Sequence, residues 1–162
     1  MNDLQPSAFP GHEGFADEAS VQSLELSLRD KQICFVVPAG ARLDAISLHL
    51  PGGMLVLGAL RGKVICSQGA IIIAKGGEFQ GDAEAHSFFI EGVVTSPAIN
   101  SNRVTLSKLT AREKRTRVDG VDRVEPGLIA ISSHATICAH MRAQLFEIPR
   151  NANLNRSILE SI

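Results

Sequence analysis

Histidine and cysteine are the residue types in this chain that could bind a metal ion or act in nucleophilic catalysis. The five histidines are scattered, and two of them, His134 and His140, flank one segment at a spacing of six. On a β-strand both would point to the same face. Two imidazoles without a third ligand or a nearby carboxylate do not make a zinc site. We therefore predict that both face solvent and that the chain binds no metal.

The three cysteines, Cys34, Cys66 and Cys138, lie far apart among apolar residues. No C-x-x-C pair occurs, so a zinc site or a redox motif is not indicated. The first residues also lack the basic stretch and apolar run of a signal peptide. We therefore expect buried free thiols in a reducing compartment, which places the protein in the cytoplasm.

Sequence motifs for phosphate binding and hydrolysis are missing. There is no G-x-S-x-G, H-E-x-x-H, P-loop or G-x-G-x-x-G pattern. Lys75 stands before two glycines but without the G-K-[ST] order. Arg61 and Lys63 straddle Gly62 on an expected outer face, and two cations in a chain of net charge −1 do not make a nucleic-acid track. The sequence thus predicts no cofactor and no nucleic-acid partner.

His86 is the histidine with an enzymatic interpretation. It follows "GDAEA" and could stand on a loop between coils, as the catalytic histidine of left-handed β-helix acyltransferases does. Those enzymes require a strict six-residue period, which this chain does not keep. We predict a protein without enzymatic activity and keep a β-helix acyltransferase as the least favoured alternative.

Composition points to a single domain with an aliphatic core. The chain has 162 residues, of which 44% are hydrophobic, with seven Phe, no Trp, no Tyr and 14 Gly. This length allows one full core. No run of about 18 apolar residues occurs, so no membrane-spanning helix is predicted.

A short repeat runs through the middle of the chain. "VVPAGARLDA" (36–45) aligns without a gap on "IIAKGGEFQG" (72–81), and an apolar-x-Gly-x-apolar-x-small phrase fits both "VLGALRG" (56–62) and "IEGVVTS" (90–96). The apolar anchors of these phrases recur at spacings of 17, 19 and 15 residues: Leu43, Leu60, Phe79 and Val94. Between them, apolar and polar residues alternate with a period of two, as in β-strands.

A repeat of about 17 residues is too short for a propeller blade and fits three short strands with three corners. The sequence therefore predicts an all-β parallel β-helix, a solenoid whose coils bury their inner side chains against the coils above and below. The four anchors would form one core ladder. Four small residues would lie at corners or where the tube narrows: Ala45, Gly62, Gly81 and Ser96.

The predicted boundaries divide the chain into three parts. Residues 1–31 read as a flexible acidic tail, 32–148 as the β-helix domain and 149–162 as a C-terminal tail. Within the domain, 110–127 is dense in charge and reads as a solvated insertion, with a binding loop as the alternative. Three apolar residues near the C-terminus have helical spacing and predict a short end helix: Leu154, Ile158 and Ile162.

The segment from Val36 to Ala98 resembles the bactofilin family of bacterial polymer-forming cytoskeletal proteins. The resemblance rests on "VLGALRG", on "KGGEFQGDAEA", and on their order and spacing. It implies a right-handed, three-faced β-helix with flexible tails. It also implies nucleotide-independent filaments that scaffold cell-shape or envelope machinery, with tails that reach partner proteins near the membrane. The acidic N-terminal segment lacks the basic or strongly apolar character that supports membrane attachment.

The ends of a solenoid expose unpaired backbone groups over an apolar core unless a cap covers them. "ICFVV" (33–37) and "LFEI" (145–148) would form the two ends, without an adjacent capping helix. We predict end-to-end self-assembly through these strands, with contacts from Phe35, Val37, Phe146 and Ile148. The alternative is a non-polymerising adaptor, because "GGMLVLGALRG" also resembles the C-terminal domain of the bacterial septum-site inhibitor.

Overall fold

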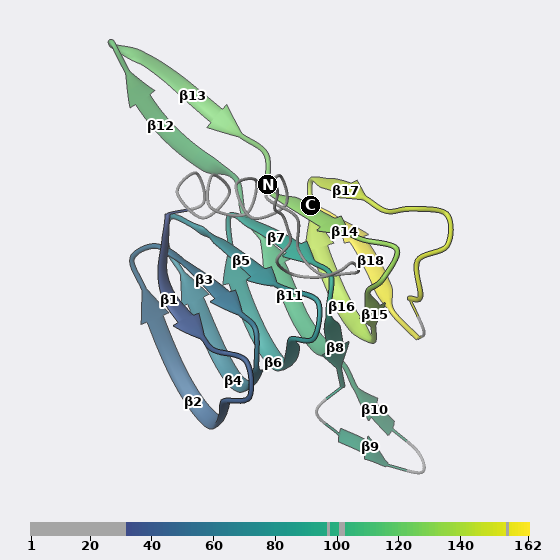
Figure 1. The fold of residues 1–162 in the computed structure, drawn as a ribbon. Coiled ribbons are helices and arrows are strands. Elements are labelled where there is room, and N and C mark those ends of the chain that lie inside the picture. The colour runs from purple at the N-terminus through teal and green to yellow at the C-terminus, as the bar shows by residue number, and fades with distance from the viewer. Residues whose placement is uncertain (1–31, 97, 101–102, 155) are drawn as a thin grey trace, which may run out of the picture. The chain divides into compact units, whose positions relative to one another are not determined.

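Every regular element described in the structure is a β-strand, as the computed structural model shows (Figure 1). The structure describes residues 32–96, 98–100, 103–154 and 156–162, so the predicted tail over 1–31 lies outside the described residues. Parallel strands stack as a β-solenoid of about six turns. The prediction of an all-β parallel β-helix is therefore confirmed.

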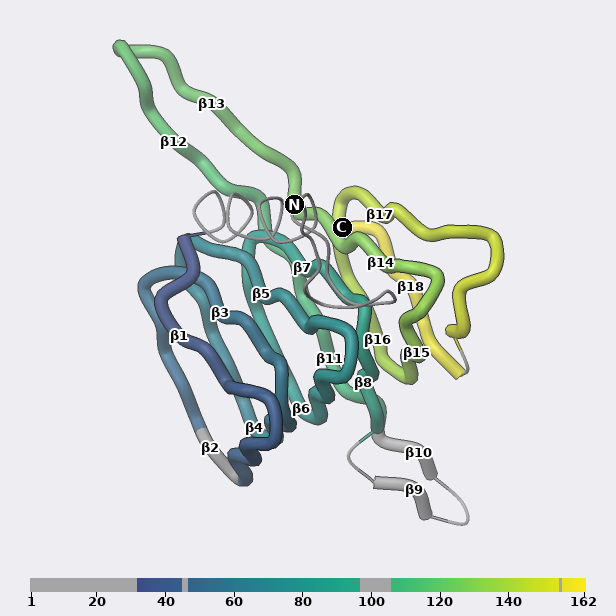
Figure 2. Tube along the Cα trace, viewed as in Figure 1, coloured from purple at the N-terminus to yellow at the C-terminus, as the bar shows by residue number. Residues whose placement is uncertain are grey.

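One face of the solenoid is a six-stranded parallel sheet, to which each coil contributes one short strand. From end to end, its members are β1 (Ile33–Val37), β3 (Gly53–Val56), β5 (Ala70–Ile73), β7 (Ser87–Ile90), β14 (Leu128–Ile131) and β17 (Leu145–Glu147). Figure 2 follows the winding of the chain from one strand of this sheet to the next. The pairing is continuous from β1 to β17.

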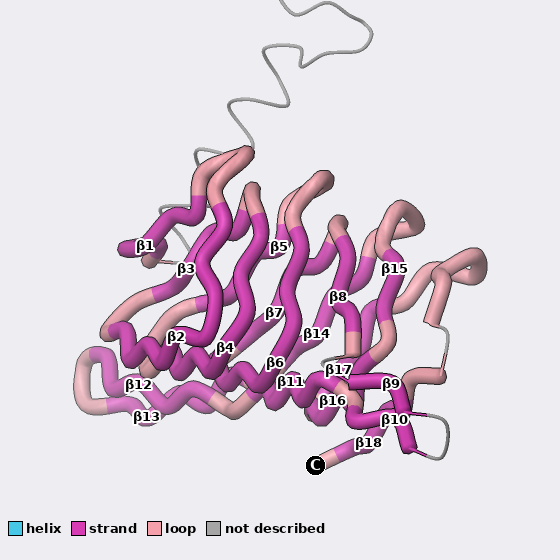
Figure 3. Tube along the Cα trace, turned by 90° about the horizontal axis from the view of Figure 1, so that it is seen from below, coloured by secondary structure: helices cyan, strands magenta, loops and turns pink. Residues whose placement is uncertain are grey.

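A second parallel sheet provides the other two faces because its longest strands bend. Its members are β2 (Arg42–Leu50), β4 (Ala59–Cys66), β6 (Glu78–Ala85), β8 (Val93–Thr95), β11 (Ser107–Ala111), β15 (Thr136–Ile137), β16 (Ala139–Ala143) and β18 (Ile158–Ser161). The first residues of β6 pair with β8 and its last residues pair with β11. Strand β6 thus belongs to two faces, which Figure 3 shows from below.

The bend lies at paired glycines. Gly62 of β4 is in register with Gly81 of β6, and both have positive φ values, 150° and 132°. The next coil turns this corner with Ser107, whose hydroxyl accepts a hydrogen bond from the Gly81 N–H at 2.9 Å. Ser96 was expected at this corner, but it follows β8 and precedes an inserted hairpin, so Ser107 takes its place.

Two antiparallel hairpins are inserted into the stack, one within the fourth coil and one between the fourth and fifth coils. The first, β9 (Ala98–Asn100) with β10 (Arg103–Thr105), separates β8 from β11. The second, β12 (Lys114–Val118) with β13 (Val121–Glu125), separates β11 from β14 and projects away from the solenoid (Figure 1). The charged segment predicted over 110–127 is thus an insertion, with Thr110 and Ala111 still in β11.

Within the segment predicted as a C-terminal tail, 149–162, the structure has a strand and not a helix. Ile158–Ser161 forms β18, which pairs in parallel with β16 as part of the last coil. No helix is found among the described residues, so the predicted end helix is wrong. The exposed edge of β16 offers backbone hydrogen bonds to the following chain, and they outweigh the helical spacing of a few apolar residues.

Contacts divide the chain into two units, Met1–Gln32 and Ile33–Ile162, and the eighteen strands found in the described residues belong to the second. The part of the chain that the structure describes contains no helix long and apolar enough to span a bilayer.

Candidate functional site

The four anchors of the repeat form one vertical row in the structure. Leu43 is in register with Leu60, Leu60 with Phe79, and Phe79 with Val94. Leu60, Phe79 and Val94 are almost completely buried, and Leu43, at the start of the row, is half-buried. Burial of each such side chain contributes ~1.5–3 kcal/mol. The row therefore makes up the core behind one face of the solenoid.

Both ends of the solenoid present strand edges. Within the described residues, β1 and β2 each pair with a single strand, β3 and β4, and at the other end β17 and β18 each pair with a single strand, β14 and β16. The outer N–H and C=O groups of these four strands have no strand partner among the described residues. An edge of this kind can accept another strand by backbone hydrogen bonds.

Phe35 and Phe146 stand at the two ends of one inward-facing row. The pairings place the following side chains in register: Phe35, Met54, Ile71, Phe88, Ile129 and Phe146. The four middle members are fully buried, whereas both terminal phenylalanines are only half-buried. Each end of the row thus leaves an aromatic ring partly uncovered.

The other two predicted end residues differ from each other. Val37 is fully buried in the core, so its side chain is not available as an exposed end contact. Its row continues in register through Val56 and packs inside the tube. Ile148, directly after β17, is 36% exposed. The C-terminal end therefore offers the larger apolar contact surface.

A second inward row also ends uncovered at the C-terminal end. It runs through Leu48, Val64, Ala83, Leu109, Met141 and Leu159. Leu109 and Met141 are fully buried, but Leu159 is 40% exposed. Four more exposed apolar residues lie in or beside the same last coil: Leu145, Ile148, Ile158 and Ile162. Leu159 lies in the segment predicted as a C-terminal tail, so the sequence pattern did not indicate it as an end contact.

One of the three faces at this end is partly covered. Asn153 forms a parallel bridge with Thr136, and its carbonyl accepts a hydrogen bond from the Ile137 N–H at 2.9 Å. The Ser157 hydroxyl donates to the Ile137 carbonyl, also at 2.9 Å. The segment between β17 and β18 therefore closes β15, and the open edges at this end are those of β17 and β18.

A cleft of about 410 Å³ lies where hairpin β12–β13 leaves the solenoid. It is lined by residues that include Cys66, Ser67, Glu84, His86 and Arg112. Glu84 and Arg112 form an ion pair at 2.8 Å. The His86 ring is 3.0 Å through Nδ1 from the Arg112 carbonyl oxygen, and its Nε2 lies 3.7 Å from a Glu125 carboxylate oxygen. These contacts hold the base of the hairpin against the corners of the coils.

Cys66 is not an activated nucleophile. Burial raises the pKa of the Cys66 thiol to about 12, and the neighbouring Cys34 adds to this shift. A reactive cysteine needs a lowered pKa, so Cys66 is a core thiol. Cys138 is half-buried and Cys34 is exposed, which corrects the expectation that all three thiols are buried.

The pKa of Cys66 predicts a pH dependence of stability. In the unfolded chain this thiol ionises near pH 9, but in the folded protein it keeps its proton to about pH 12. Stability is therefore lost as pH rises from 9 toward 12, by about 1.4 kcal/mol per unit. Urea unfolding at pH 8 and 10.5, at equal protein concentration, should show about 2 kcal/mol more loss for the wild type than for Cys66→Ala. Equal losses would contradict this assignment.

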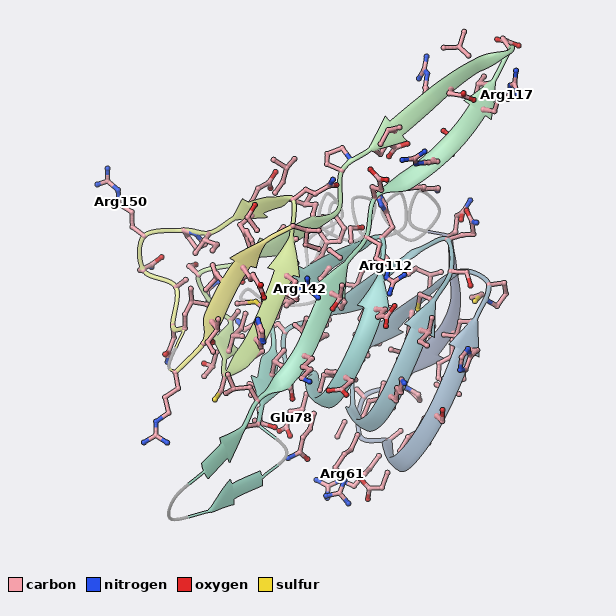
Figure 4. All side chains as sticks on the ribbon, turned by 180° about the vertical axis from the view of Figure 1, so that it is seen from behind. Arg61, Glu78, Arg112, Arg117, Arg142 and Arg150 are labelled. Carbon is pink, nitrogen blue, oxygen red and sulfur yellow. The ribbon has the colours of Figure 1, made fainter. Side chains whose placement is uncertain are left out.

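The remaining candidate residues are not brought together. His134 lies exposed in the turn after β14, whereas His140 lies on β16 with its Nε2 2.8 Å from Glu160. In the described ranges, no three or more His, Cys, Asp or Glu side chains cluster so that they could hold a metal ion. Arg61 (Figure 4) and Lys63 are exposed on either side of the Gly62 bend, as predicted.

Comparison of this chain with protein-family models, with curated proteins and with solved structures gave no match.

Proposed function

We propose that this protein is a structural component that assembles end to end, without nucleotide, into filaments that scaffold cell-shape or envelope machinery. The observation that carries the proposal is the pair of half-buried phenylalanines, Phe35 and Phe146, at opposite ends of one buried row. Stacking a second solenoid on either end would bury a ring that the single chain leaves partly in water. The resemblance of Val36–Ala98 to bactofilins points the same way.

The two kinds of interaction needed for such a joint are both available at the C-terminal end. Strands β17 and β18 provide backbone donors and acceptors, and Ile148 and Leu159 provide apolar surface beside Phe146. Backbone pairing fixes the register of a joint, and apolar burial stabilises it. Because each added subunit presents a new open end, this contact leads to a filament when opposite ends join.

Electron microscopy of the purified full chain without nucleotide tests the proposal. We expect filaments whose repeat along the axis matches one solenoid, together with fast-sedimenting material whose amount rises with protein concentration. A single small species at every concentration, with no filaments in negative stain, would contradict end-to-end assembly.

A non-polymerising adaptor is the second candidate, favoured by the partial closure of the C-terminal end. The bridge between Asn153 and Thr136 covers one of its three faces and thereby reduces the surface that a second copy can contact. An adaptor of this kind would sediment as a dimer at all concentrations. Sedimentation velocity over a wide concentration range therefore separates the two functions.

A further inference from the structure

Beyond its base, which contacts the coils through Glu125 and His86, hairpin β12–β13 projects into solvent, and Figure 4 shows Arg117 near its tip. All residues of β13 are exposed, and three valines of the hairpin are at least half-exposed: Val118 (50%), Val121 (60%) and Val124 (54%). An isolated two-stranded hairpin is only marginally stable in water. Exposed valines on such an arm indicate that a further strand or surface covers it.

The turn of the hairpin determines which backbone groups face outward. Asp119 and Gly120 both have positive φ, 52° and 77°, as in a two-residue type I′ turn. In such a hairpin the flanking pair, Val118 with Val121, is hydrogen-bonded, and the pattern then alternates along the strands. Val124 therefore directs its backbone N–H and C=O away from β12, toward the free edge of β13.

The sequence of β13 is complementary to itself in the antiparallel direction. When two copies pair with Val124 opposite Val124, Arg123 of each copy lies opposite Glu125 of the other. This arrangement gives one apolar pair and two pairs of opposite charge, all from exposed positions. Because Val124 is at the centre, its outward N–H and C=O face those of Val124 in the other copy.

The other edge of the hairpin is unsuited to the same contact. If β12 paired with itself around Thr116, Arg115 would lie opposite Arg117, and pairing around Arg115 would place two arginines face to face. Like charges directly opposite destabilise a strand pair. Cationic side chains along an edge are a common protection against strand addition. The charges therefore select β13 as the associating edge.

We propose that β13 is a self-association edge, through which two copies of this chain join as a four-stranded antiparallel sheet. The contact is isologous, so it closes on two copies. It lies on the hairpin and not at the solenoid ends, so it does not depend on end-to-end assembly. If filaments form, the same edge would link neighbouring filaments side by side.

Sedimentation equilibrium of the full-length Phe146→Arg chain tests this edge separately from the C-terminal end. We expect a monomer–dimer equilibrium that Val124→Pro weakens at least tenfold, because proline removes the outward N–H and leaves the bonds to β12 in place. The matched control is Arg117→Pro, which makes the same change at an outward-facing position of β12. It should leave the dimer unchanged.

A charge exchange provides a second test that does not depend on proline. Arg123→Glu should weaken the dimer because it places two acidic residues opposite each other, and the double change Arg123→Glu with Glu125→Arg should restore it. The proposal is overturned if the Phe146→Arg chain without a further change is monomeric at every concentration. It is also overturned if the two proline variants behave alike, or if the double change fails to restore the dimer.

Discussion

Replacing Phe146 with arginine is expected to abolish end-to-end filaments and to leave the solenoid folded. In the single chain Phe146 is only half-buried, so an arginine there can extend its guanidinium into water. In a joint between two copies the same guanidinium would be buried over Ile129 without a partner, at a cost of several kcal/mol for every joint. Negative-stain microscopy measures the filaments, and circular dichroism with thermal unfolding measures the fold.

The same row provides a second variant and a matched control. Phe35→Arg changes the opposite end of the row and should also remove filaments. Glu147→Arg introduces the same side chain one position further along β17, at an exposed site, and should leave filaments in place. Filaments in both folded phenylalanine variants would show that the joint lies elsewhere. If Phe146→Arg is insoluble, Leu159→Arg tests the same end through the other uncovered row.

The stacking of the solenoid could be predicted because each coil repeats a local constraint. The apolar anchors must meet across neighbouring coils, so their uneven spacings of 17, 19 and 15 residues already define a register. That register, Leu43 to Leu60 to Phe79 to Val94, is present in the strand pairs. Because successive coils pair through the repeat itself, this register can be predicted without information from distant parts of the chain.

The hairpins and the last coil could not be predicted with the same rule. In the charged insertion, "VDGV" contains the Asp-Gly turn signal of a hairpin, but the density of charge around it favoured a loop. For the last coil, the short run "ILES" (158–161) has no repeat phrase, and its strand pairing depends on the edge that β16 offers. Leu159 was missed for this reason, although it ends a row as Phe146 does.

At the solenoid ends, the sequence predicts the end strands, but the fold decides which of their side chains are accessible. "ICFVV" and "LFEI" were recognised as end strands from their apolar character alone. Which of their side chains remains accessible depends on whether it terminates a row or lies within the tube. Phe35 and Phe146 terminate one, whereas Val37 is sealed in the core. Sequence pattern thus locates the end coils, and packing decides the contact residues within them.

Gly81→Ala is expected to destabilise the solenoid by about 3–5 kcal/mol, because it combines two separate costs. The backbone at Gly81 has φ +132°, which an alanine adopts only with strain. In addition, a Cβ at this position would lie 2.0 Å from the carbonyl oxygen of Gly62 on the preceding coil. The coils that contain β4 and β6 would have to move apart at the bend where each of these strands passes from one face to the next.

Gly76→Ala is the matched control that separates these two costs. Gly76 also has positive φ, +90°, but a Cβ there would meet nothing within 4 Å. Its substitution should cost only the backbone strain, about 1–2 kcal/mol. Urea unfolding in the Phe146→Arg chain keeps the measurement free of filament disassembly at that end. If the two alanine variants lose the same stability, close contact between successive coils at Gly62 and Gly81 does not limit the fold.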